Sequence, residues 1–176
     1  GERLSKEDGL TLFASADIAR IGYLADLLRQ RLSGDNVYFN VNRHVNLTNI
    51  CVSRCRFCAF GCDEGDKKAY AMKQEEVLRI AKQAAQDPDL RELHIVSGLH
   101  PEWPFEYYLD ILRLLKRELP HLHLKAFTAV EIHYFTKLSG LSVQEVLKAL
   151  QEAGLQSIPN AVIEANKFFE VQKHLA

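Results

Sequence analysis

The sequence predicts an α/β fold in which parallel strands alternate with helices, as about the first four units of a parallel (β/α) barrel behind an N-terminal helix. Three short apolar segments, centred near residues 94, 123 and 156, lie 29 and 33 residues apart. This spacing is the length of one strand followed by one helix. A closed barrel of eight units takes about 250 residues, and the chain has 176. We therefore expect about half of a barrel.

The first expected element is a helix at 14–32, because its apolar residues recur at helical spacing. Ser15 is its predicted N-cap, and Gly34 marks its end. Two short extended segments, at 37–39 and 45–47, then lead into a cysteine-rich stretch.

Helices and strands alternate after the cysteines. The expected elements are, in order, a helix ending at Pro88, a strand at 93–96, a helix at 104–120 and a strand at 122–127. Ser142 and Glu145 form a capping box that starts the next helix, which ends at Gly154. A last apolar segment follows at 155–158. The loops after the strands should meet at one edge of the sheet, where parallel folds place their active sites.

The chain divides into an N-terminal helical extension (1–36), a partial barrel (37–159) and a divergent C-terminal tail (160–176). Its 22 Lys and Arg nearly balance 23 Asp and Glu, so we expect a small-molecule partner and neither nucleic acid nor a membrane. The sequence has no apolar run as long as a membrane span, and residues 1–4 lack the charged-then-apolar order of a signal peptide, so we expect neither feature. We expect a cytoplasmic protein. In the cytoplasm, clustered cysteines more often bind metal than form disulfides.

All four cysteines lie in one segment, NICVSRCRFCAFGC, at residues 49–62. Cys51, Cys55 and Cys58 have the spacing C-x3-C-x2-C, so one short loop can aim three sulfurs at a single point. Thiolates at this density suit soft metals and iron–sulfur clusters. Three protein ligands leave one iron of a four-iron cluster open to bind another molecule.

The charges near the loop favour thiolates, because 41–62 contains Arg43, Arg54 and Arg56 but no Asp or Glu. Three alternatives stay open. Cys62 could be a fourth ligand that closes a zinc or cluster site, although we expect it to be a bystander. The cysteines could also be structural, or form a redox switch.

The segment 51–58 resembles the cluster loop of radical S-adenosylmethionine (radical SAM) enzymes. Together, NRHVNLTNICVSRCRFCAF (42–60), ELHIVSGLHPEWPFEYY (92–108) and LHLKAFTAVEI (122–132) resemble, more narrowly, the aminodeoxyfutalosine synthase family of menaquinone biosynthesis. Cyclic dehypoxanthine futalosine synthases and deazaflavin-forming synthases share much of this pattern. The resemblance implies that 37–159 forms part of a radical SAM barrel.

The resemblance also implies roles for individual residues. Cys51, Cys55 and Cys58 would ligate a 4Fe-4S cluster whose open iron binds S-adenosylmethionine. Phe57 would lie against the adenine, and Ser97 and Gly98 match the paired-glycine segment near the methionine amino group. The candidates for the substrate site are Asn42 and His44 for binding, and Arg43, His100 and Glu131 for catalysis.

Each substrate-site candidate has a plainer alternative. Arg43 could pair with a substrate carboxylate or remain a solvated charge. Glu131 could act on the substrate or supply negative charge at a helix N-terminus. We leave six aromatic residues out of the site. Strand alternation and surface position explain His94, His121 and His123. Trp103, Tyr107 and Tyr108 are expected to be core or cap residues.

The implied reaction adds a 5'-deoxyadenosyl radical to the enol-ether double bond of 3-[(1-carboxyvinyl)oxy]benzoate. Rearrangement with loss of the carboxylate then gives aminodeoxyfutalosine. It requires a low-potential electron donor such as flavodoxin or ferredoxin. The resemblance ends near Pro159, so we expect a truncated or rearranged member that is weakly active or inactive alone. A complementing chain or an oligomer would then cover its open sheet edge. A non-enzymatic metal-binding module is the remaining hypothesis.

Overall fold

The computed structural model describes residues 3–53, 55 and 58–159. The chain forms two compact units, Gly1–Phe39 and Asn40–Ala176. The boundary predicted from the sequence lay after residue 36, and the predicted tail at 160–176 lies outside the described residues.

The first unit contains two helices, α1 (Lys6–Ala14) and α2 (Ile18–Ser33). The side chain of Asp17 caps α2 by accepting a hydrogen bond from a backbone N–H of the first turn. Gly34, with a φ of 58°, ends α2 as predicted. The prediction that Ser15 is the N-cap was wrong, because Ser15 follows α1. The apolar pattern did not indicate α1.

The second unit contains a parallel sheet of β1 (Asn42–Val45), β2 (Glu92–Ile95) and β3 (His123–Ala126), in the order β1-β2-β3. The predicted α/β fold with parallel strands is therefore confirmed. Within the described residues, the expected fourth strand is represented only by an isolated parallel bridge between Lys125 and Ser157.

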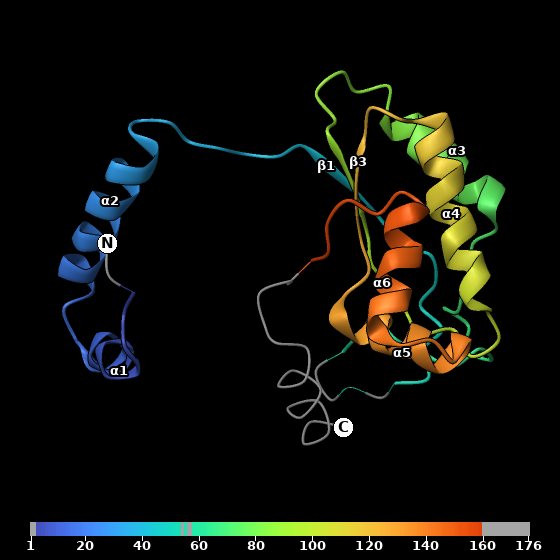
Figure 1. The fold of residues 1–176 in the computed structure, drawn as a ribbon, viewed down its shortest axis with the longest axis horizontal. Coiled ribbons are helices and arrows are strands. Elements are labelled where there is room, and N and C mark those ends of the chain that lie inside the picture. The colour runs from blue at the N-terminus through green and yellow to red at the C-terminus, as the bar shows by residue number, and fades with distance from the viewer. Residues whose placement is uncertain (1–2, 54, 56–57, 160–176) are drawn as a thin grey trace. The chain divides into compact units, whose positions relative to one another are not determined.

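In the described part of the second unit, four helices accompany the sheet: α3 (Gln74–Ala84), α4 (Phe105–Glu118), α5 (Ala129–Ser139) and α6 (Val143–Glu152). Figure 1 shows α3 and α4 on the same side of the strands. The predicted capping box of Ser142 and Glu145 is present at the start of α6. The sequence pattern did not identify α5 as an element.

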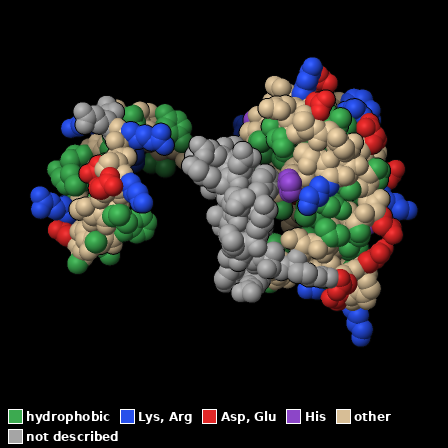
Figure 2. Space-filling view, turned by 60° about the horizontal axis from the view of Figure 1, so that its bottom comes forward, with side chains coloured by type: hydrophobic (Ala, Val, Ile, Leu, Met, Phe, Trp, Pro, Cys, Tyr) green, Lys and Arg blue, Asp and Glu red, His purple; other side chains and the backbone are tan. Residues whose placement is uncertain are grey.

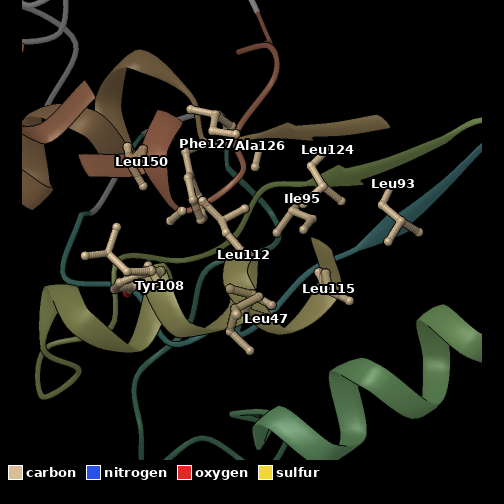
Figure 3. Close-up of a cluster of buried hydrophobic side chains, with 14 of the residues drawn as sticks. Leu47, Leu93, Ile95, Tyr108, Leu112, Leu115, Leu124, Ala126, Phe127 and Leu150 are labelled. Atoms are coloured by element: carbon tan, nitrogen blue, oxygen red, sulfur yellow. The ribbon is translucent and has the colours of Figure 1, made fainter. Parts of the chain in front are cut away.

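The core lies between one face of the sheet and these helices. Alternate strand residues, including Leu93, Ile95 and Leu124, are fully buried there. Figure 3 shows them beside Leu112 and Leu115 of α4. This packing fixes the strands, and therefore fixes the loops that leave their carboxyl ends.

On the face of the second unit that Figure 2 shows, acidic and basic side chains are mixed rather than gathered into one patch of a single sign. Of the helices in the described part of the chain, none combines the length and apolar character needed to cross a membrane.

Candidate functional site

Two buried polar residues anchor the segment that leads from β1 into the cysteines. The Thr48 hydroxyl donates a hydrogen bond to the carbonyl of Tyr70 (2.7 Å) and accepts one from the N–H of Ile50 (3.0 Å). The Asn49 amide donates to the carbonyl of Lys68 and accepts from the N–H of Tyr70, both at 2.8 Å. These bonds fasten the loop to the segment that returns after it. The sequence analysis missed both anchors.

The backbone closes the cysteine loop on itself. The N–H of Cys51 donates to the carbonyl of Cys62 (3.1 Å), and the N–H of Cys62 donates to the carbonyl of Asn49 (2.9 Å). Cys62 is buried, at 3% exposure. It therefore forms part of the base of the loop.

Cys55 and Cys58 line one pocket of about 140 Å³ together with Ser53 and Gly61. The Ser53 hydroxyl lies 3.2 Å from the sulfur of Cys55. The N–H of Gly61 donates to the sulfur of Cys58 at 3.4 Å. Both contacts place a group that can donate a hydrogen bond beside a cysteine sulfur, the atom that binds metal.

Cys51 lines a neighbouring pocket of about 190 Å³, which Cys62 also borders. Gly61 lies between two of the cysteines: a Cβ at this glycine would lie 3.4 Å from the Cβ of Cys51 and 3.8 Å from the sulfur of Cys58. Across 3–53, 55 and 58–159, no three His, Cys, Asp or Glu side chains converge closely enough to hold one metal ion. The three sulfurs thus share one loop without meeting at a point.

The donor set of the loop fits an iron–sulfur cluster. Three free thiols come from one loop, and polar hydrogens of Ser53 and Gly61 are within reach of two of them. Soft thiolate donors in this number suit such clusters better than they suit hard cations. Phe57, predicted to contact the adenine, lies outside the described residues.

Gly98 lies against the backbone that enters the cysteine loop. Its N–H donates to the carbonyl of Thr48 (2.8 Å), and the carbonyl of Leu99 accepts from the N–H of Val52 (3.0 Å). A Cβ on Gly98 would overlap the carbonyl group of Ile50. The segment after β2 therefore pairs with the start of the loop, and only glycine permits this approach.

Glu131 connects the loops that follow β2 and β3. Its carboxylate accepts hydrogen bonds from the N–H of Ser97 (3.0 Å) and from the N–H (2.7 Å) and hydroxyl (2.8 Å) of Thr128. The side chain is 3% exposed. Burial raises the pKa of Glu131 to about 7, although these hydrogen bonds oppose the rise. Glu131 is thus part of the N-terminal capping box of α5, the alternative role that the sequence suggested. Its carboxylate also accepts the hydrogen bond from Ser97.

His100 also follows β2, but it is packed into the protein at 4% exposure. Its ring stacks on Trp103 with centroids 4.4 Å apart, and its Nδ1 accepts from the N–H of Glu102 at 3.2 Å. Tyr134 donates to its backbone carbonyl at 2.9 Å. Burial lowers the pKa of His100 below its ordinary value, with a partial opposing effect of nearby acidic groups.

Asn42 and Arg43 lie at the start of β1, away from the end that leads to the cysteines. Both line a pocket of about 350 Å³ with Asp87 and Leu90, which precede β2, and with residues of α3. This pocket belongs to the amino-terminal edge of the sheet. The structure does not bring these two predicted residues to the cysteine loop.

His44 lies on the face of the sheet opposite the apolar core. The strand register places His44, His94 and Lys125 side by side across β1, β2 and β3. The rings of His44 and His94 stack with centroids 4.4 Å apart. The sequence analysis set His94 aside and did not consider Lys125, because only the register shows that they share a row with His44.

Comparison with known proteins identifies relatives of this chain. The sequence model of the "Radical SAM superfamily" matches residues 45–170. The aminodeoxyfutalosine synthase of Streptomyces coelicolor is 48% identical over 99% of this chain and 45% of its own length. That of Thermus thermophilus is 44% identical over 93% of this chain and 44% of its own length. The 5-amino-6-(D-ribitylamino)uracil--L-tyrosine 4-hydroxyphenyl transferase of Methanopyrus kandleri is 43% identical over 77% of this chain and 37% of its own length.

Two solved structures share the fold. Methylornithine synthase (PylB) aligns with a TM-score of 0.61 and 16% identity, over 96% of this chain and 60% of its own. The FeFe-hydrogenase maturase HydG from Carboxydothermus hydrogenoformans aligns with a TM-score of 0.60 and 17% identity, over 89% and 44%. The chain thus spans less than half the length of the curated relatives described above. It belongs to the radical SAM superfamily, whose members use a 4Fe-4S cluster and S-adenosylmethionine.

Proposed function

We propose that this chain supplies the part of an aminodeoxyfutalosine synthase that holds the cluster and S-adenosylmethionine. The whole enzyme would add a 5'-deoxyadenosyl radical to the double bond of 3-[(1-carboxyvinyl)oxy]benzoate, and rearrangement with loss of the carboxylate would form aminodeoxyfutalosine for menaquinone biosynthesis. The observation that carries the proposal is the loop of Cys51, Cys55 and Cys58, joined through Gly98 to the segment after β2. The identity of 44–48% to two aminodeoxyfutalosine synthases supports the choice of substrate.

Cys51, Cys55 and Cys58 would hold the cluster. When bound, the cluster and S-adenosylmethionine supply a 5'-deoxyadenosyl radical, because cysteine-ligated clusters reach potentials low enough to reduce a sulfonium. The chain positions and shields this chemistry. Gly98 lets the segment after β2 lie directly against the loop, and the Glu131 carboxylate holds the preceding N–H of Ser97. Fixed positions of this kind lower the entropic cost of bringing reactants together.

We propose that turnover requires the rest of a barrel, either in the same polypeptide or in a complementing chain. The described sheet has three strands, and an isolated bridge pairs Lys125 of β3 with Ser157. The proposed partners are a small acidic substrate and a low-potential donor such as flavodoxin or ferredoxin. A cytoplasmic location suits the four free cysteines, because reducing conditions preserve thiols.

A sister reaction is the second candidate. The Methanopyrus kandleri 4-hydroxyphenyl transferase is 43% identical to this chain, close to the identity of the Thermus thermophilus aminodeoxyfutalosine synthase. It covers a smaller share of the chain, which favours the first proposal. Product analysis by mass spectrometry, after anaerobic incubation with each family's substrate, separates the two.

Anaerobic cluster reconstitution tests the proposed metal site. We expect the unmodified protein to bind about four irons per chain, as one 4Fe-4S cluster requires, and to release 5'-deoxyadenosine once reduced. Cys55→Ser should lose the cluster. Cys62→Ser should retain it, because the Cys62 thiol is buried at the base of the loop.

The opposite pattern would overturn the proposal. Zinc bound at about one ion per chain, with Cys62 required for binding, would indicate a closed site and a metal-binding module. Turnover by residues 1–176 alone would disprove the need for the rest of the barrel. A product only from the sister enzymes' substrates would overturn the substrate assignment and leave the cluster assignment intact.

A further inference from the structure

The face of the sheet opposite the core carries two rows of polar side chains. The first row is Asn42, Glu92 and His123, and the second, which we call the polar row, is His44, His94 and Lys125. Parallel sheets are usually covered and apolar on both faces. Because the face opposite the core is polar in this sheet, we expect a polar ligand or solvent to lie against it.

Lys125 is the lysine of the polar row. Its strand neighbours Leu124 and Ala126 are in the core, so its side chain leaves the sheet on the opposite face. Among the described residues, no acidic side chain forms an ion pair with it. Burial lowers the pKa of His94, the nearby positive charges of His44 and Lys125 lower it further, and the nearby Glu92 opposes the fall. The polar row itself contains no acidic side chain.

Two polar atoms near the polar row have no hydrogen-bond partner among the described residues. They are Oε1 of Glu92, a residue that is 7% exposed, and Oδ1 of Asn46, which follows β1. Oε1 of Glu92 lies 3.9 Å from Nδ1 of His94, too far for a hydrogen bond. Both atoms are hydrogen-bond acceptors, and buried polar atoms are rarely left unpaired in native proteins, so a water or another hydrogen-bond donor is expected beside them.

The polar row lies one residue before the carboxyl end of each strand. Val45, Ile95 and Ala126 end the three strands, and the cysteine loop and the Gly98 segment follow the first two. A molecule on the polar row would therefore lie directly beneath the proposed site of radical formation.

We propose that the polar row binds the carboxylate of an acidic small-molecule substrate, with Lys125 as its ionic partner. This inference rests on the proposed function, which supplies the orientation of the substrate. The enol-ether end of 3-[(1-carboxyvinyl)oxy]benzoate must face the cysteine loop in order to react. The ring carboxylate then points away from the loop, toward Lys125. A Lys–carboxylate pair shielded from water is stronger than a neutral hydrogen bond.

Equilibrium dialysis against two acids tests this pairing, using this chain together with the rest of its barrel, in one polypeptide or as a complex, with its cluster oxidised to prevent turnover. One acid is 3-[(1-carboxyvinyl)oxy]benzoate, and the other is 2-phenoxyacrylate, which lacks only the ring carboxylate. We expect Lys125→Met to weaken binding of the first acid by roughly tenfold or more and to leave binding of the second unchanged. Lys125→Arg should retain most of the affinity.

Lys148→Met is the matched control, because it removes the same charge from an exposed position on α6. Unchanged affinity for S-adenosylmethionine shows that each variant is folded, and Lys125→Gln replaces Lys125→Met if the latter unfolds. If the Lys125 variant binds both acids as the unmodified protein does, or loses both equally while folded, the inference is wrong. If the unmodified protein binds neither acid, the proposed function fails, and the inference fails with it.

Discussion

Gly98 is the residue whose side chain, a single hydrogen, matters most to the shape of the site. A Cβ at this position would lie 3.0 Å from the carbonyl carbon of Ile50 and 3.2 Å from that of Asn49, and would overlap the Ile50 oxygen. Gly98→Ala must therefore push the cysteine loop away from the segment after β2. We expect a loss of about 1–3 kcal/mol in unfolding free energy, measured by urea denaturation, and a lower iron content after reconstitution.

Gly65→Ala is the control for this change. A Cβ at Gly65 meets nothing within 4 Å, so we expect its unfolding free energy to change by less than about 0.5 kcal/mol. Equal stability of the Gly98 and Gly65 variants would show that the loop does not need the close approach.

Glu131 makes stability depend on pH. Its folded pKa of about 7 lies above the ordinary value of 4.5, so between these values the folded state binds the proton more tightly than the unfolded state. The stabilisation that the protonated carboxyl gives the folded state is therefore fully present below about pH 4.5 and is lost as pH rises toward 7. The shift corresponds to roughly 3 kcal/mol.

Glu131→Gln removes this titration while keeping a side chain of the same size. We expect the free energy of unfolding to fall less between pH 4.5 and 7 in the variant than in the unmodified protein, as measured by urea denaturation at several pH values. Glu145, in an exposed capping box whose hydrogen bonds lower its pKa, is the matched control. Glu145→Gln should keep the unmodified slope across this range, whereas parallel curves for all three proteins would refute the assignment.

At the scale of the elements, α6 shows how a local cap supports the core. Ser142 accepts a hydrogen bond from the N–H of Glu145, and α6 buries Val146 and Leu150. Ser142→Ala leaves the first turn without its side-chain acceptor. We expect a loss of about 1 kcal/mol in the unfolding free energy of the second unit, measured by thermal or urea denaturation followed through Trp103.

The same substitution in α1 provides the comparison. Ser5 and Asp8 form an equivalent capping box, but α1 contains no buried residue. Ser5→Ala should therefore leave the Trp103 transition in place. An equal effect of both variants would contradict the division of the chain into two units.

At the scale of the whole molecule, the core belongs to the second unit alone. Its buried apolar cluster runs from Val45 to Leu155, and the first unit ends at Phe39. We expect a fragment of residues 40–159 to unfold in one cooperative transition, with far-UV and near-UV circular dichroism changing together. A fragment that keeps its helical signal but lacks a near-UV signal from Trp103 would contradict this expectation.

The sequence predicted most of the second unit because its signals are local. Helix caps such as Ser142 and alternation such as that of Leu93 and Ile95 act over a few residues and were confirmed. The prediction for the first unit was less accurate, because Ser15 and Asp17 are both good capping residues and the apolar pattern does not choose between them. Thr48 and Asn49 could not be recognised as loop anchors from the sequence, because their hydrogen-bond partners are about 20 residues away along the chain.

The sequence alone determined the superfamily, through the spacing of Cys51, Cys55 and Cys58, since a short loop needs no distant residue to bring its own sulfurs together. Tertiary structure decided which side chains share a surface. Strand register placed Lys125 beside His94 and His44, and helix packing placed the Glu131 carboxylate against Ser97. Such neighbours are separated by 30 or more residues, and only the packing of the core fixes how far each strand slides past the next.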